Sequence, residues 1–278
     1  MITNQIFGSK EFKTKKELFH SLKDNEHTII GLKKSTVFKS IEKGQSIPNL
    51  SIIPKSATQK NQYESGFTYA AINSTHWLDS HQDVHIKGCY TRTVKEQQGR
   101  VYYIDTHMKG LSNIITMKND IEMFYDDIEW SLLGKNIQGT TEALFFKMPN
   151  DKIKTDYLNL IQQDKELQNS LAMTYKNIVM AIDSDDSEFK ENKDVFDKYI
   201  DTIANKEQAQ KDGIFFAVKE LAIMGEGSLC PIVGGSNSAT SVFQIKDIQN
   251  GKPTEPTAAE KSLQEQKRNY LISKNKRK

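Results

Sequence analysis

The chain of 278 residues is poor in cysteine and in long apolar runs, and each shortage excludes a class of protein. Its only two cysteines, Cys89 and Cys230, are too few for a disulfide framework and form no metal site by themselves, so we expect two reduced thiols. No run approaches the roughly 18 apolar residues that a membrane-spanning helix needs. The N-terminus lacks a basic start followed by an apolar core, as a signal peptide would have. We therefore expect a soluble, intracellular protein.

The near-neutral charge and the absence of glycine motifs exclude further classes. The formal net charge is only +2, whereas a dedicated nucleic-acid binder usually carries a marked basic excess. The sequence contains no G-x-x-x-x-G-K-[ST] phosphate loop and no G-x-G-x-x-G fingerprint, so nucleotide chemistry has no support. Gly-x-Ser-x-Gly is also missing, which argues against an α/β-hydrolase.

The hydrophobic pattern predicts many strands with helices between them. Thr14 and Glu17, in capping-box spacing, predict a helix over 14–23, and Asn119 and Glu122 predict one running towards Trp130. Helical spacing predicts further helices over 151–167 and 188–203, and β-rich runs predict strands at 28–32, 67–72, 100–104, 114–117, 143–147, 171–182, 215–224 and 229–233. This order favours an α+β fold with a mainly antiparallel sheet or barrel as its core.

Composition divides the chain into three parts. Residues 1–62 form a predicted helix and strand module with a polar connector, residues 63–245 form the main domain, and residues 246–278 form a linker and a basic tail. The tail from 258 to 278 carries seven Lys and Arg residues against two Glu, or +5. A tail of this kind can touch nucleic acid or an acidic partner, but we favour a solvated terminal helix.

The densest polar cluster is the alternating segment from Asp79 to His85. Asp79, His81, Asp83 and His85 offer carboxylate and imidazole ligands that suit zinc, which would make the protein a metal-dependent hydrolase. Period-2 spacing on a strand, however, sets these groups in a line that cannot close a tetrahedron without distant help. We prefer a turn held by Asx-type hydrogen bonds to the backbone.

Three other groups are candidates for nucleophilic catalysis, although spacing alone decides none of them. His107 follows the predicted strand 100–104, where a general base can be held in a fixed orientation. Ser170 lies between the predicted helix 151–167 and the strand 171–182, and a serine needs a nearby base to act as a nucleophile. Glu220 and Glu226 lie on or just after the strand 215–224, and either can orient a histidine.

Five segments in order over roughly residues 8–240 resemble the tailed-phage prohead (capsid maturation) protease family, which is related in fold to the herpesvirus assemblins. The first is the Asp-rich stretch 73–88, and the second is Tyr103-Ile104-Asp105-Thr106-His107, in the place of the family's catalytic histidine. The third, Gln168-Asn169-Ser170-Leu171-Ala172-Met173-Thr174-Tyr175, resembles the segment with the catalytic serine. The last two are 203–220 and the closing Glu226-Gly227-Ser228-Leu229 with Gly235-Ser236-Asn237.

The resemblance implies a serine endopeptidase with an assemblin-like fold. Ser170 would be its nucleophile, His107 its base and Glu226 its acid, with Glu220 as the alternative acid. It implies no cofactor and no metal. Relatives often have Gly or Arg two residues after the serine, where this chain has Ala172. Loss of one oxyanion-hole donor costs about 2.7–4 kcal/mol of transition-state stabilisation. Either a backbone N–H supplies the oxyanion hole, or the enzyme is slow.

The resemblance also implies partners and a location. The substrates would be the scaffold or the delta region of the major capsid protein, and the protease itself, cut in the host cytoplasm inside assembling proheads. Self-association inside the prohead is expected, and binding to membranes or nucleic acid is not. The alternative, which Ala172 favours, is an inactive protease-like scaffold or capsid assembly protein.

Overall fold

The computed structural model describes residues 2–8, 10–37, 52–54, 63–163, 167–231 and 239–246. Most of the predicted connector, the segment Gly235-Ser236-Asn237 and the predicted tail lie outside these residues. In the described part, no helix is long and apolar enough to cross a membrane.

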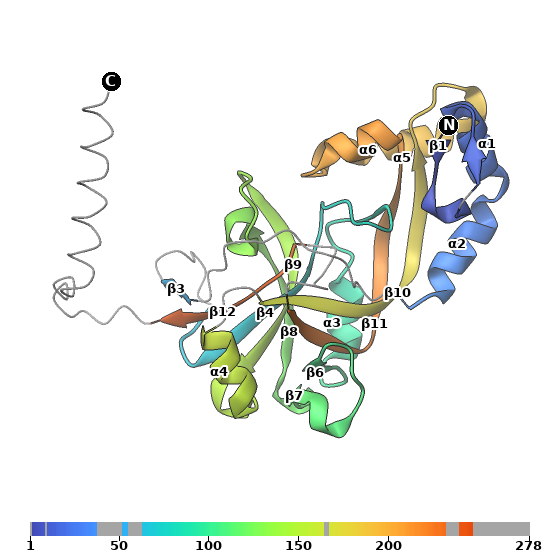
Figure 1. Ribbon diagram of the computed structural model, residues 1–278. Helices are drawn as coiled ribbons and strands as arrows, with labels where there is room; N and C mark the ends of the chain where they lie inside the picture. Colours follow the sequence, from blue (N-terminus) through green and yellow to red (C-terminus); the bar gives the residue numbers. More distant parts are fainter. Residues whose placement is uncertain are drawn as a thin grey trace, which may run out of the picture.

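Two five-stranded sheets form the centre of the molecule (Figure 1). The first has the order β10-β11-β6-β7, and β5 also pairs with β11; the strands are β10 (Leu167–Ile182), β11 (Ile214–Pro231), β6 (Tyr102–Asp105), β7 (Ile114–Thr116) and β5 (Asp83–His85). The second has the order β3-β12-β4-β9-β8, with β3 (Ile52–Pro54), β12 (Ser241–Lys246), β4 (Phe67–Ser74), β9 (Thr140–Pro149) and β8 (Glu122–Glu129). Most neighbours are antiparallel, whereas β11 is parallel to β6 and β5, and β12 to β3.

Helices surround the two sheets. They are α1 (Lys15–Asp24), α2 (Glu26–Ser35), α3 (Thr91–Gln97), α4 (Thr155–Gln163), α5 (Lys190–Tyr199) and α6 (Lys206–Asp212). Short 3-10 turns lie at Gln5–Phe7, Leu111–Asn113, Lys118–Asp120, Trp130–Leu133, Asn150–Lys152, Ser187–Phe189 and Ile200–Thr202, and β1 (Ile2–Thr3) pairs with β2 (Glu11–Phe12). The predicted α+β architecture is therefore present.

The predicted barrel is wrong for the described strands. No hydrogen-bonded ladder joins the two sheets there, so they remain separate layers. Ile72 of β4 and Phe146 of β9 belong to the same buried cluster as Leu171 of β10 and Leu229 of β11, whereas Phe145 faces a second cluster with Tyr69. Successive residues of a strand point to opposite faces, so one face of the second sheet packs on the first.

The N-terminal helix α2 packs on the long strand β10, and α1 packs on α2 (Figure 1). The Thr14 side chain accepts from the Glu17 N–H at 3.2 Å, and the Glu17 carboxylate accepts from the Lys13 N–H at 2.7 Å, which confirms the predicted cap. Leu22 of α1 and Ile29 of α2 belong to the cluster that also holds Leu171. The N-terminal residues therefore share their core with the main domain.

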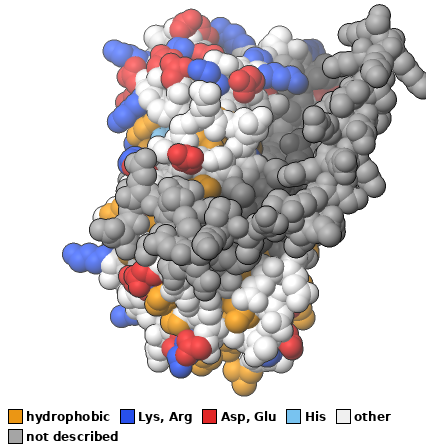
Figure 2. Space-filling model, turned by 90° about the vertical axis from the view of Figure 1, so that its left-hand side faces the viewer, with side chains coloured by type: hydrophobic (Ala, Val, Ile, Leu, Met, Phe, Trp, Pro, Cys, Tyr) orange, Lys and Arg blue, Asp and Glu red, His pale blue; other side chains and the backbone are white. Residues whose placement is uncertain are grey.

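Acidic and basic side chains alternate over the upper end of the molecule (Figure 2). Ion pairs on helices and nearby turns join Lys16 to Asp186 at 3.0 Å and Lys206 to Asp201 at 2.8 Å. Exposed pairs of this kind contribute little stability, typically about 0–1 kcal/mol.

Two local predictions are wrong. Most of the predicted helix from Asn119 towards Trp130 is the strand β8 (Glu122–Glu129), because eight residue pairs join β8 to β9, from Glu122–Lys147 to Glu129–Thr140. Residues 28–32 lie in the helix α2 rather than in a strand, with Ile29 turned into the core. The predicted strands 215–224 and 229–233 are one strand, β11, as far as Pro231.

Candidate active site

The first sheet brings the three predicted catalytic residues together from three strands. Ser170, the fourth residue of β10, lies directly opposite Ser228 of β11. Ser228 in turn pairs with Ile104 of β6, and His107 follows two residues after the end of β6. Glu226 and Ser228 are two residues apart on β11, so their side chains lie on one face of the sheet.

The side chains of His107, Ser170 and Glu226 form a continuous hydrogen-bonded chain. His107 Nε2 lies 2.7 Å from Ser170 Oγ, and His107 Nδ1 lies 2.8 Å from Glu226 Oε1. A carboxylate only accepts, so the hydrogen-bond pattern assigns the ring hydrogen of neutral His107 to Nδ1. Nε2 is then free to accept the hydroxyl hydrogen of Ser170, which is the arrangement that a serine nucleophile requires.

A strained turn carries His107. The Met108 N–H donates to the Asp105 carbonyl at 2.8 Å, and the two central residues, Thr106 and His107, have φ values of 41° and 60°. Positive φ in residues other than glycine costs about 1–3 kcal/mol each and persists only where the surroundings impose it. Here the Thr106 N–H donates to the Leu229 carbonyl at 3.0 Å, which fixes the turn against β11.

A bulge in β11 carries Glu226. The register is Leu171 opposite Gly227 and Met173 opposite Ile223, so three residues of β11 face the single residue Ala172 of β10. Gly225, inside this bulge, has φ +82°, a conformation that glycine adopts without strain. Bulges next to active sites redirect side chains, and this one aims the Glu226 carboxylate at His107.

The second sheet supports the site from behind. A Cβ built on Gly227 would lie 2.8 Å from Phe146 Cε2 and 3.2 Å from Ile72 Cδ1. Gly227 separates Glu226 from Ser228, so the absence of a side chain there lets β4 and β9 pack directly beneath the site.

Asn169, next to the serine, joins both sheets and was not singled out by sequence reasoning. Its Nδ2 donates to the Ser241 carbonyl at 2.7 Å and to the Ala71 carbonyl at 3.2 Å, and its Oδ1 accepts from the Tyr103 hydroxyl at 2.6 Å. Asn169 is fully buried and all of these partners are internal. The amide therefore fixes the backbone of β10 beside Ser170.

The site is closed to solvent, although its border is open and apolar. Ser170 is 0% exposed, whereas Leu111, in the segment after His107, is 89% exposed. A pocket of about 360 Å³ opens beside the acid and is lined by Tyr102, Ile104, Lys109, Gly110, Leu111, Ile114, Met224, Gly225 and Glu226. This volume falls in the range of about 300–1,000 Å³ that ligand pockets occupy.

Comparison of the chain with protein-family models, curated proteins and solved structures gave no match.

The alternative acid, Glu220, does not reach His107. Glu220 lies on β11 before the bulge, and its Oε1 accepts from Arg92 Nη1 at 3.0 Å. Glu226 is therefore the carboxylate that the fold places on the histidine. Ala172 is fully buried and faces the bulge, with no polar side-chain atom to offer.

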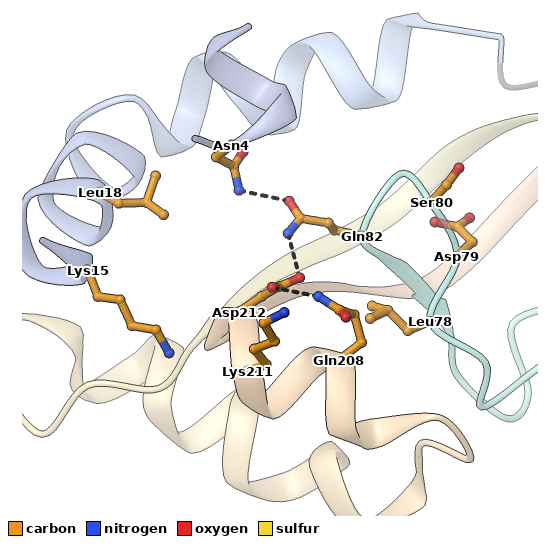
Figure 3. A pocket seen from close by; sticks show the side chains of 10 residues that line it. All are labelled: Asn4, Lys15, Leu18, Leu78, Asp79, Ser80, Gln82, Gln208, Lys211 and Asp212. Carbon is orange, nitrogen blue, oxygen red and sulfur yellow. Dashed lines mark hydrogen bonds between the residues drawn. The ribbon is translucent and has the colours of Figure 1, made fainter. Parts of the chain in front are cut away.

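The segment from Asp79 to His85 forms the expected Asx turn. Asp79 Oδ1 accepts from the N–H groups of His81 at 2.8 Å and of Asp83 at 2.9 Å. Burial, and then the charge of Asp83, raise the pKa of Asp79 well above its usual value. Figure 3 shows Asp79 and Ser80 on this turn, beside a pocket where Gln82 lies between Asn4 and Asp212.

Two of the four proposed metal ligands of this segment, Asp83 and His85, have separate partners. The Asp83 carboxylate accepts from Lys33 at 2.5 Å and from the Tyr175 hydroxyl at 2.8 Å, and it is fully buried. His85 is buried beside Asn73, and burial lowers its pKa to about 4. The grouping of ligand atoms found in the described part is a different one, His20, Asp186 and Glu188, where His20 pairs with Glu188 and Asp186 with Lys16.

The two cysteines are buried free thiols, as expected. Burial raises the pKa of Cys230 to about 12 and that of Cys89 well above its usual value. Neither is a candidate nucleophile, because a reactive cysteine needs a lowered pKa.

Proposed function

We propose that the protein is a serine endopeptidase of the prohead maturation type, with Ser170 as nucleophile, His107 as base and Glu226 as acid. One observation carries the proposal: His107 bonds Ser170 Oγ through Nε2 at 2.7 Å and Glu226 through Nδ1 at 2.8 Å. Nucleophile, base and orienting carboxylate in hydrogen-bond reach are the signature of covalent acyl transfer.

Each group has a defined part in the reaction. Ser170 Oγ attacks the scissile carbonyl carbon while its proton passes to His107 Nε2. The Glu226 carboxylate holds the imidazole with its hydrogen on Nδ1 and stabilises the imidazolium. His107 then donates the proton to the leaving amine. Water attacks the acyl-enzyme while His107 Nε2 takes one of its protons, and that proton returns to Ser170 Oγ as the acyl group leaves. A backbone N–H would supply the oxyanion hole, since Ala172 has no donor in its side chain.

Substrate binding requires the site to open. Ser170 is fully buried, so a polypeptide reaches it only after a local opening of the site. The open pocket beside Glu226 is largely apolar, with Leu111 and Met224 exposed at its border. Extended polypeptide with apolar side chains suits such a surface better than a small charged molecule does.

The resemblance to prohead proteases supplies the remaining parts of the proposal. These are an assemblin-like fold, cleavage of the scaffold or of the delta region of the major capsid protein, self-cleavage, and action inside assembling proheads in the host cytoplasm. Self-association inside the shell belongs to the same proposal.

Co-expression with the capsid protein of the same phage tests the function. We expect trimming of the capsid protein by the wild type and none by Ser170→Ala. The matched control is Ser74→Ala, because Ser74 is also fully buried and its hydroxyl has no hydrogen-bond partner among the described residues. Equal trimming with wild type and Ser170→Ala would remove Ser170 as nucleophile.

The same experiment separates the alternative of an inactive scaffold, which Ala172 favours. An inactive scaffold supports shell assembly with no trimming in any variant, and Ser170→Ala then assembles shells as the wild type does.

A further inference from the structure

Ser228 contacts both His107 and Glu226, the proposed base and acid. Its Oγ donates to Glu226 Oε2 at 2.8 Å, and it accepts from the backbone N–H of His107 at 3.0 Å. The same oxygen lies 3.2 Å from His107 Nδ1. Ser228 is fully buried and lies directly opposite Ser170 across the β10–β11 ladder.

These contacts fix the two groups relative to each other. Glu226 has two carboxylate oxygens, of which Oε1 bonds His107 and Oε2 bonds Ser228, so the carboxylate is held against rotation. The backbone of His107 is in the strained left-handed region, with φ 60°, and the Ser228 oxygen accepts its N–H. One hydroxyl therefore supports both the strained turn and the carboxylate.

We infer that Ser228 is a positioning residue for the relay, holding the Glu226 carboxylate and the His107 turn in the geometry that lets Nε2 accept from Ser170. This inference rests on the proposed function for its effect on rate, and on the hydrogen bonds alone for its effect on His107. Ser228 does not touch the scissile bond and takes no proton in the reaction.

The role predicts a direction for the pH dependence of catalysis. A donor to a carboxylate stabilises its charged form, and its removal favours protonation. The relay works only with charged Glu226 and neutral His107, so Ser228→Ala moves the acid limb of the kcat/KM profile to higher pH. A residue that only fills space would leave this limb in place.

The experiment compares wild type, Ser228→Ala, Ser228→Thr and the control Ser74→Ala. Proton NMR follows the His107 Nδ1–H signal, identified by its loss in His107→Gln, and this readout does not depend on activity. We expect Ser228→Ala to shift or broaden the signal and to lower kcat/KM by about 10- to 100-fold, a part of the roughly 10²–10⁴ that a positioned acid–base contributes. Ser228→Thr keeps the hydroxyl, so its His107 signal and its kcat/KM should match those of the wild type.

The outcomes separate the two proposals. An unchanged His107 signal in folded Ser228→Ala overturns the positioning role. A changed signal in a protein whose wild type shows no Ser170-dependent hydrolysis supports the positioning role and refutes the proposed function. If Ser228→Ala lowers the folded population, Ser228→Cys is compared instead, since it keeps the size and replaces the hydroxyl with a weak donor.

Discussion

Gly227→Ala should damage both the fold and the candidate site, because a methyl group there meets the second sheet. The new Cβ would lie 2.8 Å from Phe146 Cε2 and 3.2 Å from Ile72 Cδ1, closer than carbon atoms approach in well-packed cores. Both neighbours are fully buried, so neither can turn into solvent. Overpacking of this kind costs about 1–3 kcal/mol. Urea unfolding measures the loss.

A double-mutant cycle and a control identify the cause. Phe146→Leu removes the ring atom that clashes, so Gly227→Ala should cost less in the Phe146→Leu background than in the wild type, by about 1 kcal/mol. The control is Gly31→Ala in α2, where a Cβ meets nothing within 4 Å and alanine favours a helix by about 0.5–1 kcal/mol. Additive losses in the cycle, or equal losses at Gly227 and Gly31, would refute the packing argument.

Two further predictions concern buried ionisable groups. Burial lowers the pKa of His85 to about 4, below its ordinary 6.5, so the native state resists a proton that the unfolded chain accepts. The free energy of unfolding should therefore fall by about 3 kcal/mol as pH drops from about 6.5 to 4. Urea unfolding at stepped pH measures this slope, and His85→Asn should flatten it. An unchanged slope in His85→Asn would contradict the assignment to His85. Lys33→Met leaves the fully buried Asp83 carboxylate without its cation and should lower the free energy of unfolding by about 3–5 kcal/mol. Adding Asp83→Asn should recover part of this loss. A loss below about 1 kcal/mol would show that the pair is not desolvated.

The sequence predicted the helices and strands whose conformation is determined mainly by their own residues. Thr14 and Glu17 cap α1 as their spacing indicates, and the β-branched runs became strands, apart from residues 28–32, which lie in α2. The same capping pattern at Asn119 failed, because pairing with β9 outweighs a weak helical preference. A capping box is therefore informative only where no neighbouring strand competes for the backbone.

The candidate site depended on contacts that no local pattern contains. His107 and Ser170 are joined only by the pairing of β11 with both β10 and β6, which the sequence does not reveal. The choice of Glu226 over Glu220 follows from the bulge, and the glycines on both sides of Glu226 were its available signal, since glycine inside a strand indicates a bulge or a close approach. Ser228, two residues along the same face, could have been found from strand alternation.

The most direct test of the account is covalent labelling of the purified protein with a fluorophosphonate, followed by peptide mass spectrometry. A serine activated by a relay reacts with this probe, whereas an ordinary serine does not. The account predicts one modified residue, Ser170, with the modification lost in His107→Gln and strongly reduced in Glu226→Gln. Labelling of folded wild-type protein at another serine, or at Ser170 equally with and without His107, would contradict it.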